Sequence, residues 1–81
     1  MVRIDRPVET LEHVAKTLRF TTQQQETILA HFISGQDRTS GGVLQAVTSA
    51  AQTVTDADTA HEMEGVGIRA MELAAAYART R

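Results

Sequence analysis

The chain has 81 residues, of which 42% are hydrophobic and 22% charged, and its formal net charge is −2. This size and balance exclude a second domain, a disordered chain and the strongly basic composition typical of nucleic-acid-binding domains. The sequence has no cysteine, which excludes disulfides and thiolate metal sites, and its single proline and lack of tryptophan favour an all-α fold.

The first predicted helix covers residues 8–18, where apolar side chains recur at steps of three and four. Pro7 suits its first turn, because a proline lacks the N–H group that would have no partner there. Glu12 and Lys16 form an i,i+4 pair with the acid on the favourable N-terminal side. The helix is therefore expected to begin close to Pro7 and to end at about Leu18.

Thr21 and Thr22 each have a glutamine three residues later, as in a capping box, so a second helix is expected to begin there. It should end near Ser34, with Gly35 as the left-handed residue that terminates it. Residues 35–42 hold three of the five glycines and only polar residues between them. They are predicted to form the main loop of the chain.

A third helix is expected after a cap at Thr39 or Ser40. Its apolar stripe is the clearest in the chain and must be buried; it consists of Val43, Leu44, Val47, Ala50, Ala51 and Val54. After a break at residues 55–59, Thr59 and Glu62 form a further capping box, and a fourth helix runs to about Ala78. Its buried side is rich in small residues that allow close helix packing: Ala60, Met63, Val66 or Gly67, Ala70, Met71, Ala74 and Tyr77.

These patterns predict an all-α fold, a compact bundle of four short helices. Residues 1–7 form an N-terminal extension, residues 8–78 the bundle domain and residues 79–81 a C-terminal tail. Four short helices offer little cover for the large apolar side chains, so pairing of two chains would help offset the entropy of folding. The candidate interface is therefore taken from the two central stripes: Ile28, Phe32, Val43 and Val47.

The sequence gives no sign of a membrane protein or of an enzyme. It has no apolar run long enough for a membrane span, and its first residues lack the apolar stretch of a signal peptide, so we expect a cytoplasmic location and no membrane partner. A bundle of this size offers little volume for a water-excluding pocket. We therefore expect no catalytic residue, no cofactor and no small-molecule substrate.

Two patterns that could bind a metal or a phosphate are interpreted as structural. His13, His31 and His61 lie on three different predicted helices, and none has the HExxH spacing that places two imidazoles on one helix face. The loop over residues 35–42 precedes a helix N-terminus, but it lacks the Gly-Lys-Ser/Thr ending and the preceding strand of a phosphate-binding loop. The histidines are therefore expected on polar surfaces, without a metal.

The second and third helices, with their loop, can also be interpreted as a helix-turn-helix, although the loop is longer than the usual turn. The recognition helix over residues 42–54 would then have no Lys or Arg, and only Gln45, Ser49 and Gln52 could contact bases. The cations that could contact phosphates lie elsewhere, with acids between them: Arg3, Arg6, Lys16 and Arg19. Nucleic-acid binding is therefore predicted to be weak.

Residues 20–52, and above all residues 39–52, resemble the C-terminal end of a family of phage- and plasmid-borne proteins of unknown function. That end has a polar loop, a segment like Gly-x-x-x-Ala-Val-Thr-x-x-Ala-Gln and a helix rich in Glu and small residues. Residues 61–67 look like its continuation, and the residues that fit the segment are Gly42, Ala46, Val47, Thr48, Ala51 and Gln52. The larger α+β domain typical of the family is absent, so we expect an excised C-terminal domain or a free-standing relative. The resemblance implies a mobile-element setting and no catalytic residue.

The leading hypothesis for function is a non-catalytic interaction module of a phage or plasmid protein, which self-associates or docks to a protein partner. The alternative is a nucleic-acid-associated accessory module of a DNA-processing mobile-element protein. It would be favoured if the four cations formed one exposed face with the acids turned away. A metal-dependent enzyme comes third, and would be favoured if His31 and His61 converged with a glutamate.

Overall fold

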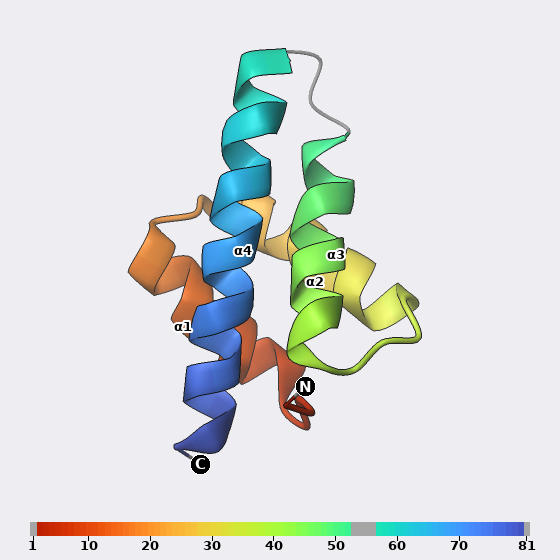
Figure 1. Cartoon of the computed structure of the whole chain (residues 1–81), viewed down its shortest axis with the longest axis vertical. Helices are drawn as coiled ribbons and strands as arrows, with labels where there is room; N and C mark the ends of the chain where they lie inside the picture. Colours follow the sequence, from red (N-terminus) through yellow and green to blue (C-terminus); the bar gives the residue numbers. More distant parts are fainter. Residues whose placement is uncertain (1, 53–56, 81) are drawn as a thin grey trace.

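The structure is a computed structural model that describes residues 2–52 and 57–80. It contains four α-helices: α1 (Pro7–Leu18), α2 (Thr22–Ser34), α3 (Ser40–Ala51) and α4 (Ala57–Arg79). The described residues form no strand, and one isolated antiparallel bridge joins Arg3 to Thr39. The prediction of an all-α helical bundle is therefore confirmed (Figure 1).

The helix α3 packs against two of the other three helices. It runs beside α4 in the antiparallel direction, with the most extensive contact of any helix pair, and it also packs against α2 (Figure 1). The helix α1 closes the bundle by contacting both α2 and α4. None of the described helices combines the length and the apolar character that crossing a membrane requires.

Several local signals act as predicted. Pro7 is the first residue of α1. At the start of α2 the Gln24 N–H group donates to Thr21 Oγ1 over 3.1 Å, and the Thr21 N–H group donates to Gln24 Oε1 over 3.0 Å, so the capping box is confirmed. The end of α1 has no glycine; Arg19 instead adopts the left-handed conformation, with a φ of 59°.

Three predictions about helix ends are wrong. Gly35 is extended, with φ −75° and ψ 165°, because the guanidinium group of Arg38, rather than a left-handed turn, satisfies the last carbonyl groups of α2. The helix α3 begins at Ser40, so the loop covers only residues 35–39. The helix α4 begins at Ala57, so Thr59 lies inside it and is not its N-cap; Ala57 and Asp58 both suit a first helical turn. The predicted stripe residue Val54 lies outside the described residues.

The core lies between the four helices and includes Ile4 from the segment before α1. Its largest fully buried side chains are Phe32, Ile28, Val14, Val43 and Val47. From α4 the core receives Ala70 and Ala74, both with no exposed surface, and Gly67. A Cβ atom on Gly67 would lie 3.2 Å from Leu44 Cδ1 and 3.4 Å from Val47 Cγ1, so the two helices approach closely at this point. The predicted buried stripes of α3 and α4 are confirmed at these positions.

The segment before α1 packs onto the bundle. The Ile4 side chain is only 3% exposed and belongs to the core cluster. The Ile4 N–H group donates to the Arg38 carbonyl oxygen over 2.6 Å, and the Ser40 N–H group donates to the Val2 carbonyl oxygen over 2.9 Å. These two hydrogen bonds hold residues 2–5 against the loop between α2 and α3. Residues 2–5 are called the N-terminal segment below.

Candidate functional site

The predicted interface is not a surface of the folded chain. Ile28 and Phe32 are 1% exposed, and Val43 and Val47 are 0% exposed, all within a single copy. These four side chains are buried by other residues of the same chain. The small residues Gly67, Ala70 and Ala74 allow α4 to pack closely against α3, and the Ile4 side chain completes the core. A partner therefore has to contact other residues.

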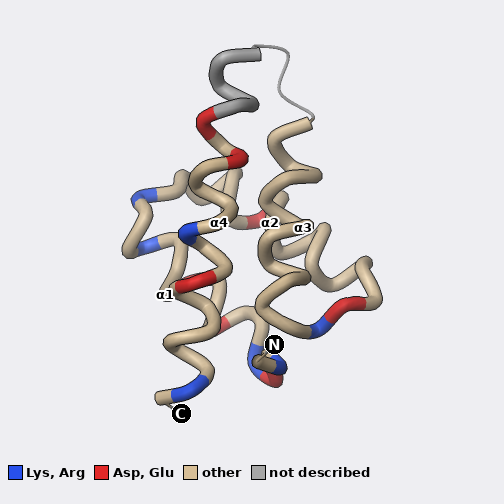
Figure 2. Tube along the Cα trace, in the orientation of Figure 1, with Lys and Arg blue, Asp and Glu red and all other residues tan. Residues whose placement is uncertain are grey.

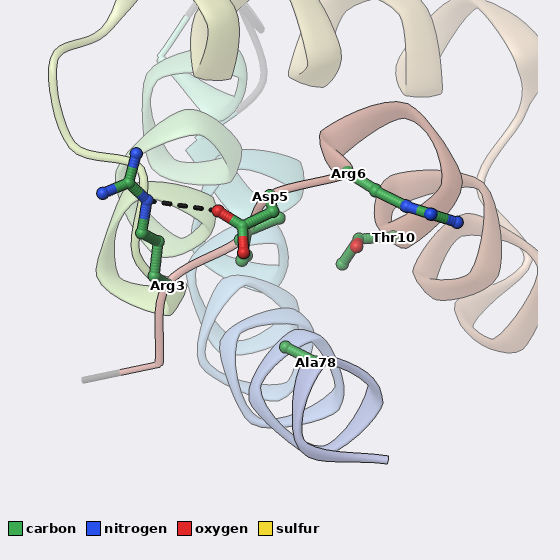
Figure 3. A pocket seen from close by; sticks show the side chains of 6 residues that line it. Arg3, Asp5, Arg6, Thr10 and Ala78 are labelled. Atoms are coloured by element: carbon green, nitrogen blue, oxygen red, sulfur yellow. Dashed lines mark ion pairs between the residues drawn. The ribbon is translucent and has the colours of Figure 1, made fainter. Parts of the chain in front are cut away.

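The N-terminal segment lies between two open hollows of the surface. A hollow of about 270 Å³ is lined by Arg3, Ile4, Asp5, Arg6, Thr10 and Ala78, and lies between the segment and the ends of α1 and α4 (Figure 3). A second hollow, of about 370 Å³, is lined by Arg3, Ile4, Asp5, Pro7, Ile33 and Arg38. Both hollows share Arg3, Ile4 and Asp5, so this segment is the centre of the candidate site.

The second hollow includes an exposed apolar side chain. Ile33, on the last turn of α2, is 48% exposed, and Pro7 on α1 is half-buried beside the same hollow. Val8, the next residue of α1, is 46% exposed. Exposure of large apolar side chains to water is unfavourable. A partner that covered these side chains would gain binding free energy from their burial.

Charged groups surround the N-terminal segment in pairs. Arg3 Nε lies 3.2 Å from Asp5 Oδ1, and Arg6 lies 3.6 Å from a Glu9 carboxylate oxygen. Figure 3 shows the Asp5 carboxylate between the side chains of Arg3 and Arg6. All four side chains are at least half exposed, so these ion pairs contribute little to stability but fix the pattern of charge at the site.

Arg38 links three parts of the site. Its guanidinium group donates to the carbonyl oxygens of Phe32 and Ile33 at the end of α2, over 2.5 Å and 2.7 Å, and lies 5.5 Å from the centre of the Phe32 ring. Its own carbonyl oxygen accepts the hydrogen bond from Ile4. Arg38 therefore holds α2, the loop and the N-terminal segment together, and it is a residue that the sequence interpretation missed.

The four predicted phosphate contacts do not gather on one face. Arg3 and Arg6 precede α1, whereas Lys16 and Arg19 lie at its other end, and a helix of 12 residues is about 18 Å long. Arg3 and Arg6 also have acids beside them. Figure 2 shows basic positions spread over separate parts of the chain and interspersed with acidic ones. Arg3 and Arg6 line a common hollow.

The arrangement of α2 and α3 does not suit a helix-turn-helix. The helix α3 packs against both α2 and α4, and most of its residues are buried. Of the three predicted base contacts, Gln45 and Gln52 are exposed and Ser49 is half-buried. A helix enclosed by two others offers too little surface to enter a DNA groove.

The histidines of the described chain lie apart. The His13 ring stacks on the Tyr77 ring, with centres 4.5 Å apart and an angle of 16° between planes, and so joins α1 to α4. His31 is half-buried and lines a hollow of about 240 Å³ with Asp37, Gln45 and Ser49 among its neighbours. The side chain of His61 lies outside the described residues. Within the described part of the chain, no three His, Cys, Asp or Glu side chains form a group that could hold a metal ion.

The titration of Asp37 is clearly shifted. The hydroxyl and N–H groups of Thr39 both donate to its carboxylate, which lowers the pKa of Asp37, while partial desolvation opposes this change. These bonds order the loop ahead of α3. The shift therefore has a structural cause and does not mark a reactive group.

Three residues of the candidate site were missed by the sequence interpretation: Ile4, Ile33 as an exposed residue, and Arg38. The only signal for Ile4 was a single apolar residue among charged ones, and a cation just after a helix was the signal for Arg38. Comparisons of the chain with protein-family models, with curated proteins and with solved structures found no match.

Proposed function

We propose that this chain is a non-catalytic interaction module of a phage or plasmid protein, which self-associates or docks to a protein partner through the surface around its N-terminal segment. The observation that carries the proposal is the hollow beside Ile33, because it combines an exposed apolar side chain with arginine and aspartate side chains at one place. Apolar contacts rimmed by charged groups are typical of protein interfaces. The resemblance of residues 39–52 supports the mobile-element setting.

The geometry favours a protein partner over a phosphate backbone. Arg3 and Arg6 each have an acid within ion-pair distance, and Arg38 donates to carbonyl oxygens. A phosphate at this site would meet the Asp5 carboxylate as well as the arginines (Figure 3). A protein segment can offer both charges and an apolar side chain, and so suits the site better.

The proposal is tested with two matched variants, Ile33→Glu and Ile68→Glu. Both residues are about half exposed, at 48% and 52%, but Ile33 lines the hollow and Ile68 lies on α4 away from it. Neither change should disturb the core. Chemical cross-linking of the chain in extracts of its host, together with sedimentation of the pure chain, should give complexes that Ile33→Glu abolishes and Ile68→Glu preserves. Complexes that survive Ile33→Glu would refute this surface.

A nucleic-acid-associated module is the second candidate, because Arg3 and Arg6 line one hollow. With these two cations on one side and Lys16 and Arg19 at the far end of α1, few phosphates can be contacted at once. We expect fluorescence anisotropy with a labelled duplex or single strand to show binding weaker than about 10⁻⁴ M at physiological salt. Submicromolar binding that charge reversal at Arg3 and Arg6 removes would make this candidate the leading function.

A further inference from the structure

The loop between α2 and α3 borders another hollow, whose lining includes no residue of the N-terminal segment. It lies where the end of α2, the loop and α3 meet (Figure 1). Its buried lining residues are Phe32, Gly42 and Ala46. The hollow has a volume of about 240 Å³. At roughly 30 Å³ for each water-sized group, it holds about eight non-hydrogen atoms, which is enough for the side chain of an arginine.

The polar side chains that line this hollow can accept hydrogen bonds. They belong to His31, Ser34, Asp37, Gln45 and Ser49. Carboxylate, amide and hydroxyl oxygens are all acceptors, and a neutral imidazole adds one acceptor nitrogen. The structure shows no hydrogen bond from the side chain of Gln45 or Ser49 to another described residue. These two acceptors are therefore open to a ligand.

Asp37 gives the hollow a negative charge. The hydroxyl and N–H groups of Thr39 both donate to Asp37 Oδ1 and lower the pKa of the carboxyl group, which is therefore ionised at neutral pH. No Lys or Arg of the described chain forms an ion pair with Asp37. The guanidinium group of the adjacent Arg38 donates to the carbonyl oxygens of Phe32 and Ile33, and Arg38 does not line this hollow.

We propose that this hollow binds a guanidinium group, carried by an arginine side chain of a protein partner. A guanidinium group is planar, positively charged and has five N–H donors, so it can meet the Asp37 carboxylate and the acceptors of Gln45 and Ser49 together. The methylene stem of the arginine can lie against Phe32 and Ala46. An ammonium group is more strongly hydrated and has only three donors, so it suits the hollow less well. This contact lies outside the surface of the proposed function and goes beyond it.

An anion suits the hollow less well, although α3 begins beside it. The Ser40 N–H group donates to the Val2 carbonyl oxygen, and the Gly42 N–H group donates to the Thr39 carbonyl oxygen. These two N–H groups are therefore already used. The Asp37 carboxylate would also repel a phosphate or a second carboxylate.

The first test compares short peptides that differ in one side chain. The peptides are acetylated and amidated Gly-X-Gly, with arginine, citrulline or lysine at the position X; citrulline has the shape of arginine without its charge. Titration of the isotope-labelled full chain, followed by NMR, should show saturable shifts at the amide groups of Gly35, Gln45 and Ser49 with the arginine peptide. The citrulline and lysine peptides should bind about threefold more weakly or less well still, as expected for a charge pair open to water.

The second test adds a positive charge beside the hollow. Gln45→Lys and Gln52→Lys make the same change at two exposed positions, but Gln52 follows the last residue of α3 and does not line the hollow. Seven residues of helix separate the two positions by about 10 Å, and at physiological salt a charge at that distance is largely screened. Gln45→Lys should therefore weaken binding of the arginine peptide about threefold or more, whereas Gln52→Lys should leave it unchanged.

Asp37→Asn removes the negative charge and should weaken binding of the arginine peptide in the same way. Because Asp37 also orders the loop through Thr39, circular dichroism has to show that this variant is folded. The Gln45→Lys variant decides the test if it is not, since the Gln45 side chain is exposed.

The outcomes separate this inference from the proposed function. Saturable binding of the arginine peptide that Gln45→Lys weakens and Gln52→Lys preserves supports the guanidinium site. Shifts that do not saturate, equal binding of the citrulline or lysine peptide, or equal weakening by the two lysine variants would overturn it. None of these measurements involves Ile33, whose variant tests the proposed function, so either can fail without the other.

Discussion

Replacing Gly42 with alanine should strongly destabilise this fold. Gly42 lies in the first turn of α3, where the loop over residues 35–39 crosses directly above it. A Cβ atom at this position would overlap the Asp37 carbonyl oxygen, and would lie 3.0 Å from the Asp37 carbonyl carbon and 3.1 Å from Phe32 Cε2. The first two atoms belong to the backbone, so the loop itself has to move by about 1 Å to reach ordinary van der Waals distance.

The expected cost is several kcal/mol. Overpacking of this kind costs about 1–3 kcal/mol, and moving the loop also weakens the bonds that Arg38 makes to Phe32, Ile33 and Ile4. Alanine is favoured over glycine in a helix by about 1 kcal/mol, which offsets part of this cost. We expect a net loss of about 2–4 kcal/mol, against a total of roughly 4–12 kcal/mol for a chain of this length.

Urea denaturation followed by far-UV circular dichroism measures this loss, and thermal melting should show a fall of about 10–25 °C. Gly65→Ala is the matched control, because Gly65 lies in an exposed part of α4 where an added Cβ atom would meet no neighbouring group of the described chain within 4 Å. That variant should be about 0.5–1 kcal/mol more stable than the parent. A Gly42→Ala protein that melts at or above the parent would refute the placement of the loop over α3.

Three further predictions concern stability. The Arg19→Gly variant should be about 1 kcal/mol more stable than the Arg19→Ala variant in thermal melts, because glycine adopts a φ of 59° without strain and alanine does not. Equal melting of the two variants would contradict the left-handed conformation at the end of α1. Val47→Asp should unfold the chain, because it places a charge in a fully buried position. Gln45→Asp, on the exposed side of α3, should have little effect on stability. Thermal melting followed by circular dichroism compares the two variants, and equal melting would contradict the orientation of α3. Thr39 lowers the pKa of Asp37, so the carboxylate stabilises the fold above its ordinary pKa, and this contribution is lost as the pH falls through the lowered value. The stability lost in Asp37→Asn should therefore shrink below about pH 4 in urea titrations, and a loss independent of pH would contradict this assignment.

Local signals in the sequence predicted most of the helices because each signal acts over a single turn. Pro7 at the start of α1 and the Thr21–Gln24 capping box depend only on neighbouring residues. The stripe through Val43 and Val47 needs only the period of a helix to be recognised as buried. These features were predictable without knowledge of the tertiary contacts.

Features that depend on distant residues were not predictable in this way. The glycines and polar residues of 35–42 predict a loop that includes Gly42, yet Gly42 lies in the first turn of α3, where the Asp37 carbonyl leaves no room for a side chain. From the sequence, Ile28 and Phe32 are expected at an interface because four short helices offer little apolar surface to cover them. That cover comes from Ile4 and from the small residues of α4, whose contribution depends on how closely the helices approach.

The fastening of Ile4 to Arg38 also bears on the order of events during translation. The ribosome makes Ile4 before Arg38, and at about 5–20 residues per second the 34 residues from Asp5 to Arg38 take roughly 2–7 s to add. During that interval α1 can already be helical, while Ile4 has neither its hydrogen-bond acceptor nor its place in the core. The N-terminal segment thus leaves the ribosome exit tunnel ahead of the residues that hold it in place, and the nascent protein carries an unpaired segment and an uncovered isoleucine until the loop after α2 has also emerged.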